Sequence, residues 1–202
     1  MPLELKICGI NSKNTIQTII QYGGCQYLGF VFYPSSPRNL SIGESKKLTS
    51  IVPNYIKKVA VLVKPEDSFV EKIKDQFDYL QVYWTSPSKS KTIKLISNKK
   101  IIQAIKVKEK EDINLYKQYI GIADKFLFDS STMEKSSIFN WSYLKNIEIN
   151  EWFLAGGINI NNLEKASKIS KKIDISSGLE DNPGVKSVKK IKKFLLKIKE
   201  IN

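Results

Sequence analysis

Short apolar segments alternate with lysine-rich amphipathic segments from one end of the chain to the other. Eight of the apolar segments have the length of a β-strand, and most are apolar throughout instead of alternating. This pattern is typical of strands that are covered on both faces. It predicts strands at Leu3–Cys8, Tyr27–Phe32, Lys57–Val63, Tyr79–Tyr83, Ile101–Val107, Lys125–Asp129, Trp152–Ala155 and Ile173–Ser176.

The amphipathic segments between these strands predict helices. Ser41 and Glu44 have the spacing of a capping box, and Pro65 directly precedes another helical segment, where proline is favoured in the first turn. The predicted helices are Thr15–Tyr22, Ile42–Ile51, Glu66–Gln76, Ile93–Ser97, Asp112–Tyr119, Trp141–Lys145, Ile160–Ser170 and Val188–Ile198.

Strict alternation of strand and helix predicts a parallel sheet with covering helices. The chain holds eight such units of roughly 25 residues, with no long linker and no break in composition. We therefore expect residues 1–202 to form a single, small and compact (β/α)8 TIM barrel that carries the catalytic site. An open, doubly wound sheet is the main alternative, since periodicity alone does not separate the two.

Composition narrows the function classes. At 42% hydrophobic the chain can bury a core, but it has no run of about 18 uncharged apolar residues, so we expect no membrane span. No secretory signal is visible, which favours the cytoplasm. Histidine is absent, and Cys8 and Cys25 are the only cysteines. This excludes histidine-based catalysis and disulfide frameworks, and we expect no metal site.

The formal net charge of +13 favours an anionic partner, but its make-up argues against nucleic acid. Of the 33 basic residues, 32 are lysine and one is Arg38. Arginine is the usual reader of bases and phosphates because its planar fork donates two parallel hydrogen bonds. We therefore interpret the lysines as solvated surface and expect no nucleic-acid partner. The single arginine that remains suggests a bidentate task for Arg38.

Two glycine-containing segments follow the last two predicted strands. In a (β/α)8 barrel the catalytic and binding groups lie at the carboxyl ends of the strands, and the loops after strands seven and eight often bind phosphate. Gly156 and Gly157 follow strand seven, and Ser177 and Gly178 follow strand eight. Glycine allows backbone N–H groups to approach a ligand closely. Alone, a Gly-Gly pair is usually an ordinary turn, but the two segments together predict a phosphate site.

Two titratable groups at strand ends suit opposite roles in proton transfer. Cys8 can act as a base in its thiolate form, and Asp129 can donate a proton as a carboxylic acid. Each also has an ordinary interpretation, since free cysteines are often small buried hydrophobes and an aspartate after a strand is often a cap or turn residue. Cys25 precedes its strand at the opposite end of the barrel, and we interpret it as structural.

Four segments in chain order resemble one enzyme family. They are Lys6–Ile10, Leu28–Arg38, Phe153–Asn159, and Asp174–Glu180 with the following Pro183–Lys186. These segments resemble phosphoribosylanthranilate isomerase, and they span nearly the whole chain.

The resemblance implies a single (β/α)8 barrel of tryptophan biosynthesis that needs no cofactor. Such an enzyme converts N-(5-phosphoribosyl)anthranilate, an aminoaldose, into an aminoketose by an Amadori rearrangement. Cys8 would be the base that removes the C2 proton, and Asp129 the acid that protonates the furanose oxygen. Arg38 would lie near the anthranilate end. The phosphate would be held by Gly156, Gly157, Ser177 and Gly178.

The chain departs from the family pattern in three places. Gln81-Val82-Tyr83-Trp84 stands where the family has Gln-Leu-His-Gly, so we expect Gln81 and Tyr83 to bind substrate, with the phenol in place of an imidazole. Trp84 adds bulk near the pocket. The family's glycine-rich stretch after the catalytic aspartate is missing from residues 130–137, and Asn11 replaces a threonine.

Two other functions stay open from the residues. Another sugar-phosphate epimerase or synthase on the same barrel would keep the phosphate site, since one fold hosts many chemistries. A basic binding protein would show salt-sensitive affinity for nucleic acid. We favour the isomerase, with a small phosphorylated substrate, no membrane partner, and a monomer in preference to a homodimer.

Overall fold

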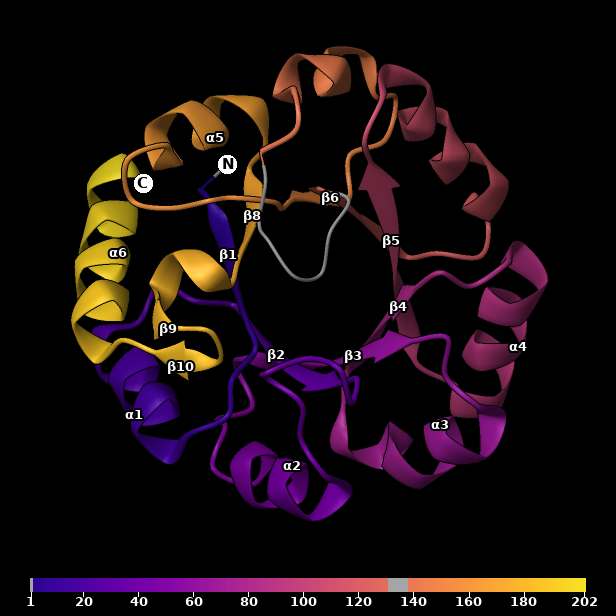
Figure 1. Ribbon diagram of the computed structural model, residues 1–202, viewed down its shortest axis with the longest axis horizontal. Helices are drawn as coiled ribbons and strands as arrows, with labels where there is room; N and C mark the ends of the chain where they lie inside the picture. Colours follow the sequence, from indigo (N-terminus) through magenta and orange to yellow (C-terminus); the bar gives the residue numbers. More distant parts are fainter. Residues whose placement is uncertain (1, 131–137) are drawn as a thin grey trace.

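Eight parallel strands close into a barrel in the computed structural model, which describes residues 2–130 and 138–202. The strands follow one another around the ring in chain order, and β1 pairs with both β2 and β8 (Figure 1). The predicted (β/α)8 barrel is confirmed, and the open-sheet alternative is wrong. The strands are β1 (Glu4–Cys8), β2 (Tyr27–Phe32), β3 (Lys57–Val63), β4 (Tyr79–Tyr83), β5 (Lys100–Val107), β6 (Lys125–Ser130), β7 (Trp152–Leu154) and β8 (Lys172–Ile175).

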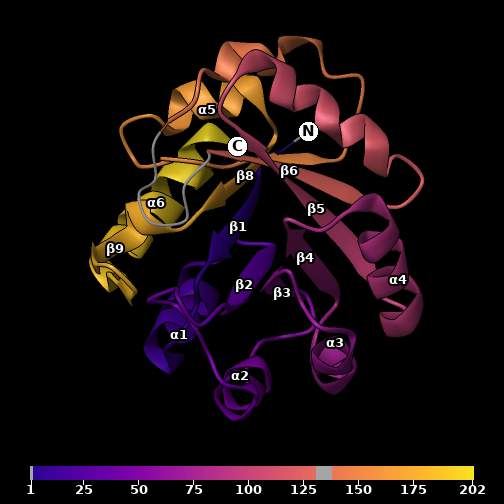
Figure 2. The ribbon, with the colours of Figure 1, turned by 45° about the vertical axis from the view of Figure 1, so that its right-hand side comes forward.

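Every predicted strand agrees with the structure to within one residue at each end. Helices surround the ring and cover its outer face (Figure 2). None of the helices in the described part of the chain is long and apolar enough to cross a membrane. The helical elements are α1 (Lys13–Tyr22), α2 (Ile42–Thr49), α3 (Asp67–Ile73), η1 (Lys74–Gln76), α4 (Pro87–Ser97), η2 (Lys110–Tyr119), η3 (Trp141–Asn146), α5 (Leu163–Ile169) and α6 (Val188–Ile201).

Two of the predicted helices, at Asp112–Tyr119 and Trp141–Lys145, have 3₁₀ geometry. The buried residues of η2 are Ile113, Tyr116 and Tyr119, which recur every three residues. A period of three matches the 3.0 residues per turn of a 3₁₀ helix, so this winding places all three side chains against the barrel.

The sequence did not predict the elements between β8 and α6. A 3₁₀ turn, η4 (Ser177–Leu179), leads into a two-stranded hairpin of β9 (Glu180–Asn182) and β10 (Val185–Lys186). Gly184 turns the hairpin with a φ of 82°, and a Cβ there would lie 2.4 Å from the Pro37 carbonyl oxygen. Glycine therefore lets the hairpin pack directly on the loop that follows β2.

Side chains of each strand alternate between two apolar layers. On β4, Leu80 and Val82 belong to the layer under the helices, whereas Tyr79 and Tyr83 belong to the layer inside the barrel. Both layers are buried, which explains why the strands read as continuous apolar runs. Fully buried polar side chains also occur on the strands, among them Lys6, Gln81 and Gln103.

Replacing Leu80 by alanine should lower the free energy of unfolding by about 2–5 kcal/mol, because a fully buried side chain leaves a cavity between strand and helices. Leu95→Ala is the matched control, since this leucine is 71% exposed and its loss should change stability by less than about 0.5 kcal/mol. Urea denaturation of both variants measures the difference. Equal midpoints would contradict the assignment of Leu80 to the core.

Candidate active site

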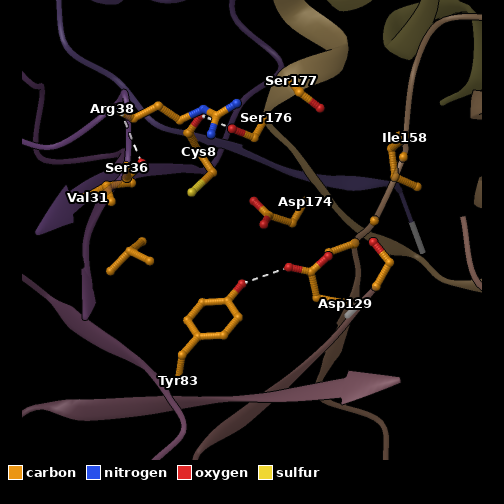
Figure 3. Close-up of a pocket in the computed structure, with 15 residues that line it drawn as sticks. Cys8, Val31, Ser36, Arg38, Tyr83, Asp129, Ile158, Asp174, Ser176 and Ser177 are labelled. Atoms are coloured by element: carbon orange, nitrogen blue, oxygen red, sulfur yellow. Dashed lines mark hydrogen bonds between the residues drawn. The ribbon is translucent and has the colours of Figure 1, made fainter. Parts of the chain in front are cut away.

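A pocket at the carboxyl ends of the strands collects most of the predicted site residues (Figure 3). Gln81 and Gly178 do not line the pocket, although each is close in sequence to a residue that does. The pocket also contains four polar residues to which no role was assigned from the sequence, Ser36, Ser130, Asp174 and Ser176. Its predicted members are Cys8, Arg38, Tyr83, Asp129, Gly156, Gly157 and Ser177.

The thiol of Cys8 lies at the end of β1 and is 8% exposed. Gly29 on the neighbouring strand makes room for it, because a Cβ there would come within 2.9 Å of the sulfur. The Ser176 hydroxyl donates a hydrogen bond of 3.1 Å to the Cys8 carbonyl and so fixes the strand end. Burial raises the pKa of the Cys8 thiol, and the cations of Lys6, Lys186 and Arg38 offset only part of this effect.

The carboxyl group of Asp129 faces the same pocket from β6 (Figure 3). Tyr83 donates a hydrogen bond of 3.0 Å to its Oδ2, and Gln81 in turn donates one of 3.2 Å to the Tyr83 hydroxyl. Desolvation, followed by the negative charge of Asp174, raises the pKa of Asp129 to about 7, against the effect of the Tyr83 hydrogen bond. Asp129 therefore keeps its proton at pH values where an ordinary aspartate is ionised.

A buried ion pair lies between these two groups. The Lys6 ammonium is 2.9 Å from Asp174 Oδ1, and the two side chains are 0% and 7% exposed. Figure 3 shows the Asp174 carboxylate between Cys8 and Asp129. From the sequence, Lys6 and Asp174 were recognised only as members of motifs and had no predicted role. Strand alternation could have found Lys6, because it lies two residues before Cys8 and therefore on the same face of β1.

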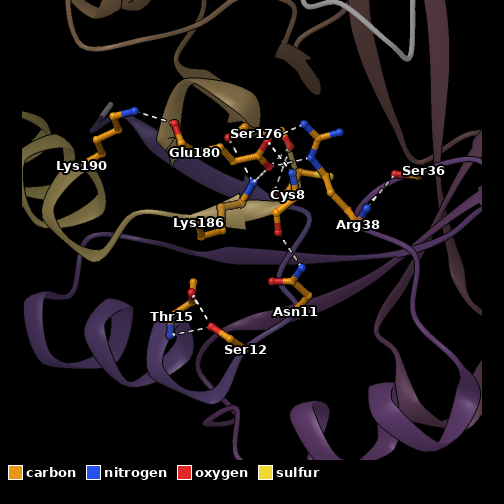
Figure 4. Close-up of polar contacts among 11 residues, drawn as sticks. Cys8, Asn11, Ser12, Thr15, Ser36, Arg38, Ser176, Glu180, Lys186 and Lys190 are labelled. Atoms are coloured by element: carbon orange, nitrogen blue, oxygen red, sulfur yellow. Dashed lines mark hydrogen bonds and ion pairs between the residues drawn. The ribbon is translucent and has the colours of Figure 1, made fainter. Parts of the chain in front are cut away.

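Arg38 has its bidentate partner inside the protein. Its Nε and Nη2 each lie 2.7 Å from an oxygen of Glu180, which also accepts from Lys186 Nζ at 2.6 Å (Figure 4). Despite burial, these two cations lower the pKa of Glu180 to about 2. Nη1 of Arg38 has no hydrogen-bond partner among residues 2–130 and 138–202, and Arg38 lines the pocket. One edge of the guanidinium is thus available to a ligand.

Glycines and serines form the pocket wall beyond β7 and β8. Gly156 and Gly157 have φ angles of 84° and 66°, and a Cβ on Gly156 would lie 2.8 Å from both the nitrogen and the Oγ of Ser130. That Oγ is buried and has no partner within the described part of the chain. Gly178 packs closely on the loop after β7, since a Cβ there would lie 2.1 Å from the Ile158 carbonyl oxygen.

Trp84 lies beside the pocket and not in it. It follows β4 with a φ of 52° and is 38% exposed, and Lys106 Nζ lies 4.6 Å from its ring centroid. It lines a separate hollow with Tyr33, Val63 and Lys64. Residues 131–137, where the family's glycine-rich stretch is missing, lie outside the described residues.

Within the described ranges, no group of three or more cysteine, aspartate and glutamate side chains is arranged to hold a metal ion. The pocket's chemistry is that of a thiol, a carboxyl with a raised pKa, and a wall of glycines and serines. A barrel with such groups at its carboxyl-terminal mouth belongs to the class of (β/α)8 enzymes that work by acid–base catalysis.

The chain belongs to the N-(5'-phosphoribosyl)anthranilate isomerase family, whose model matches residues 5–197. It is 31% identical to the N-(5'-phosphoribosyl)anthranilate isomerase of Paramagnetospirillum magneticum, over 96% of each chain. The solved phosphoribosylanthranilate isomerase of Thermotoga maritima is 25% identical with a TM-score of 0.86, over 98% of this chain and 99% of that one. A structure of such an enzyme with reduced 1-(o-carboxyphenylamino)-1-deoxyribulose 5-phosphate is 24% identical with a TM-score of 0.83, over the same shares.

Arg38→Lys should destabilise the protein by about 1.5–3 kcal/mol, because an ammonium cannot make the two parallel bonds to Glu180. It should also lower kcat/KM, since the free edge of the guanidinium is lost. Thermal unfolding and steady-state kinetics measure the two effects separately. A loss of stability with unchanged kinetics would limit Arg38 to anchoring the hairpin.

Proposed function

We propose that this enzyme converts N-(5'-phosphoribosyl)anthranilate into 1-(2-carboxyphenylamino)-1-deoxyribulose 5-phosphate in tryptophan biosynthesis. One observation carries the proposal: in a chain of this family, the Cys8 thiol and the Asp129 carboxyl face the same pocket. Family membership favours this reaction over another sugar-phosphate epimerase or synthase. The direct test is loss of substrate fluorescence when the purified protein is added, with the product identified by mass spectrometry.

The two groups divide the reaction between them. Asp129 gives its proton to the furanose oxygen while the bond from that oxygen to C1 breaks and the nitrogen lone pair forms a C1=N double bond. Cys8, as thiolate, then removes the proton from C2. The electron pair of the broken C2–H bond forms a C1=C2 double bond while the π pair of C1=N returns to the nitrogen, which gives an enolamine. Protonation at C1 and loss of the C2 hydroxyl proton give the aminoketose. No oxidant or cofactor is needed, because C1 is reduced as C2 is oxidised.

The walls of the pocket bind the two ends of the substrate. The backbone of Gly156 and Gly157, together with Ser177, holds the phosphate, because glycine lets N–H groups approach its oxygens. Gly178 supports this wall by packing on the neighbouring loop. The free edge of Arg38 pairs with the anthranilate carboxylate. In this assignment the phosphate and the carboxylate of the substrate bind to separate donors.

The Tyr83 hydroxyl contacts substrate and orients Asp129, and Gln81 acts through its hydrogen bond to Tyr83. Gln81 is fully buried and does not line the pocket. We therefore narrow its predicted substrate-binding role to positioning the phenol.

We also propose that residues 1–202 form one domain and that the enzyme acts in the cytoplasm as a monomer. The Thermotoga maritima enzyme is described as dimeric. Light scattering on the purified protein decides between the two states.

Cys8→Ala should abolish turnover and leave the fold intact, because the side chain that is lost is small and lines the pocket. Cys25→Ala is the matched control: this cysteine is also buried but lies outside the pocket, so its loss should leave kcat within about twofold. Product formation by both variants, with circular dichroism to check folding, is the measurement. A Cys8→Ala enzyme with most of its kcat would contradict the assignment of the base.

The pH dependence of kcat/KM should show reverse protonation, in which the catalytic acid has a lower pKa than the catalytic base. The active form needs the thiolate and the protonated carboxyl, yet the pKa of Asp129 is about 7 and that of Cys8 lies above its ordinary value. Below pH 7 the carboxyl is protonated and the thiolate fraction grows, so kcat/KM rises with pH. Between the two pKa values the gain in thiolate cancels the loss of protonated carboxyl, and kcat/KM is flat. It falls only above the pKa of Cys8.

Asp129→Asn should lower kcat by about 100-fold or more and change KM little, because the acid acts in the transition state. Its residual activity should go on rising past pH 7, since only the thiol then titrates. Rate profiles of both enzymes from pH 5 to 10 measure this. An effect on KM alone would make Asp129 a binding residue.

A further inference from the structure

We propose that Lys6 is a positioning residue, whose ammonium holds the Cys8 sulfur in its reactive thiolate form while Asp174 keeps that ammonium in place. The inference rests on the proposed function for its catalytic meaning, but the interaction itself can be tested without substrate. The proposed reaction assigns no proton transfer to Lys6 or Asp174. They form a fully buried ion pair in the barrel interior, 2.9 Å long.

The geometry brings the ammonium to the sulfur. Lys6 and Cys8 lie two residues apart on β1 and point to the same side of the strand. Across from them, a Cβ on Gly29 would lie 2.9 Å from the Cys8 sulfur and 3.1 Å from Lys6 Nζ. Both atoms therefore occupy the space that a side chain at position 29 would fill. Because Gly29 has no side chain, the Lys6 ammonium and the Cys8 sulfur can lie close together.

Charged groups surround the thiol from several elements. Lys6 lies on its own strand, Asp174 on β8, Lys186 on β10 and Arg38 in the loop after β2, and all four affect its ionisation. Lys186 and Arg38 share the Glu180 carboxylate, which also lies on this side of the barrel. The groups on the opposite side are Tyr83 on β4 and Asp129 on β6. Among the cations, Lys6 has the largest effect on Cys8.

The two members of the pair act most strongly on different groups. Burial raises the pKa of both Cys8 and Asp129. At Cys8 the lowering by Lys6 exceeds the raising by Asp174, whereas at Asp129 the raising by Asp174 exceeds the lowering by Lys6. The pair thus favours a thiolate at one position and a protonated carboxyl at the other. These are the two forms that the reaction needs together.

Packing alone does not require this pair. Replacing a buried ion pair by apolar side chains of similar volume is often neutral or stabilising in proteins. Stability therefore gives no reason to keep these two charges inside the barrel. Burial disfavours the Lys6 ammonium, but Asp174 and Cys8 outweigh it by charge and hydrogen bonding, and the pKa of Lys6 stays above its ordinary value.

The experiment titrates the thiol directly. In a Cys25→Ser background Cys8 is the only cysteine, and its rate of alkylation by iodoacetamide from pH 6 to 11 reports the thiolate. Lys6→Met should raise the midpoint by about one pH unit or more, which makes alkylation at pH 8 about tenfold slower. Asp174→Asn should lower the midpoint, because the thiolate becomes the main counter-ion of the ammonium. Circular dichroism confirms that each variant is folded.

Lys172→Met is the matched control. Lys172 lies on β8 and pairs with Glu4, and it is 12% exposed. It does not line the pocket, so its loss should leave the Cys8 midpoint unchanged. A purely structural role for the Lys6–Asp174 pair would move the midpoint in the same direction in both variants, or in neither. Either result would overturn the proposal.

If Lys6→Met does not fold, the Asp174→Asn variant decides alone: a lower midpoint supports the proposal and an unchanged or higher one overturns it. A second readout uses the reaction. The flat part of the kcat/KM profile should fall in Lys6→Met by up to about tenfold, because the pKa of Cys8 rises more than that of Asp129, and its alkaline limb should shift to higher pH. If the wild-type protein had no isomerase activity but the variants showed these shifts of the Cys8 midpoint, the proposed function would be refuted and the role of Lys6 would stand.

Discussion

Two opposite charges buried at the base of the pocket, on Lys6 and Asp174, are the constraint on which the site depends. Neither charge can be buried alone, because removing one partner of such a pair leaves an uncompensated charge in a medium of low polarity. The ammonium and the carboxylate therefore have to meet, and they come from β1 and β8. Cys8 and Asp129 lie on either side of Asp174 (Figure 3), and each takes its protonation behaviour in part from the charge that acts on it most strongly.

A second charged centre holds the rim of the pocket. Glu180 accepts hydrogen bonds from Arg38, Lys186 and the backbone nitrogen of Gly184 (Figure 4). These contacts tie the loop after β2 to the hairpin of β9 and β10. The Glu180 carboxylate therefore fixes two cations at the rim of the pocket, as Asp174 fixes the Lys6 ammonium in the interior. Arg38 combines this anchoring with a free edge toward the pocket.

The strands and the two acid–base candidates could be predicted from the sequence because both depend on local pattern. Buried parallel strands read as apolar runs, and the barrel rule then selects strand ends such as Cys8 and Asp129. The partner of Arg38 could not be predicted in this way, since Glu180 lies 142 residues away and belongs to a hairpin with only short strands. The same holds for the role of Gly178, which depends on the Ile158 carbonyl of another loop.

The pairing of β1 with β8 has a consequence for how the molecule acquires its chemistry. Lys6 and Asp174 are 168 residues apart, and the Ser176 hydroxyl reaches the Cys8 carbonyl across the same seam. In a chain whose first seven strand units have assembled, β1 and β8 are not yet paired. The Cys8 carbonyl then lacks its bond from Ser176, and the Lys6 ammonium lacks Asp174. Catalytic competence therefore requires that the two ends of the sheet join. During refolding, the appearance of activity reports closure of the ring and not the earlier growth of secondary structure.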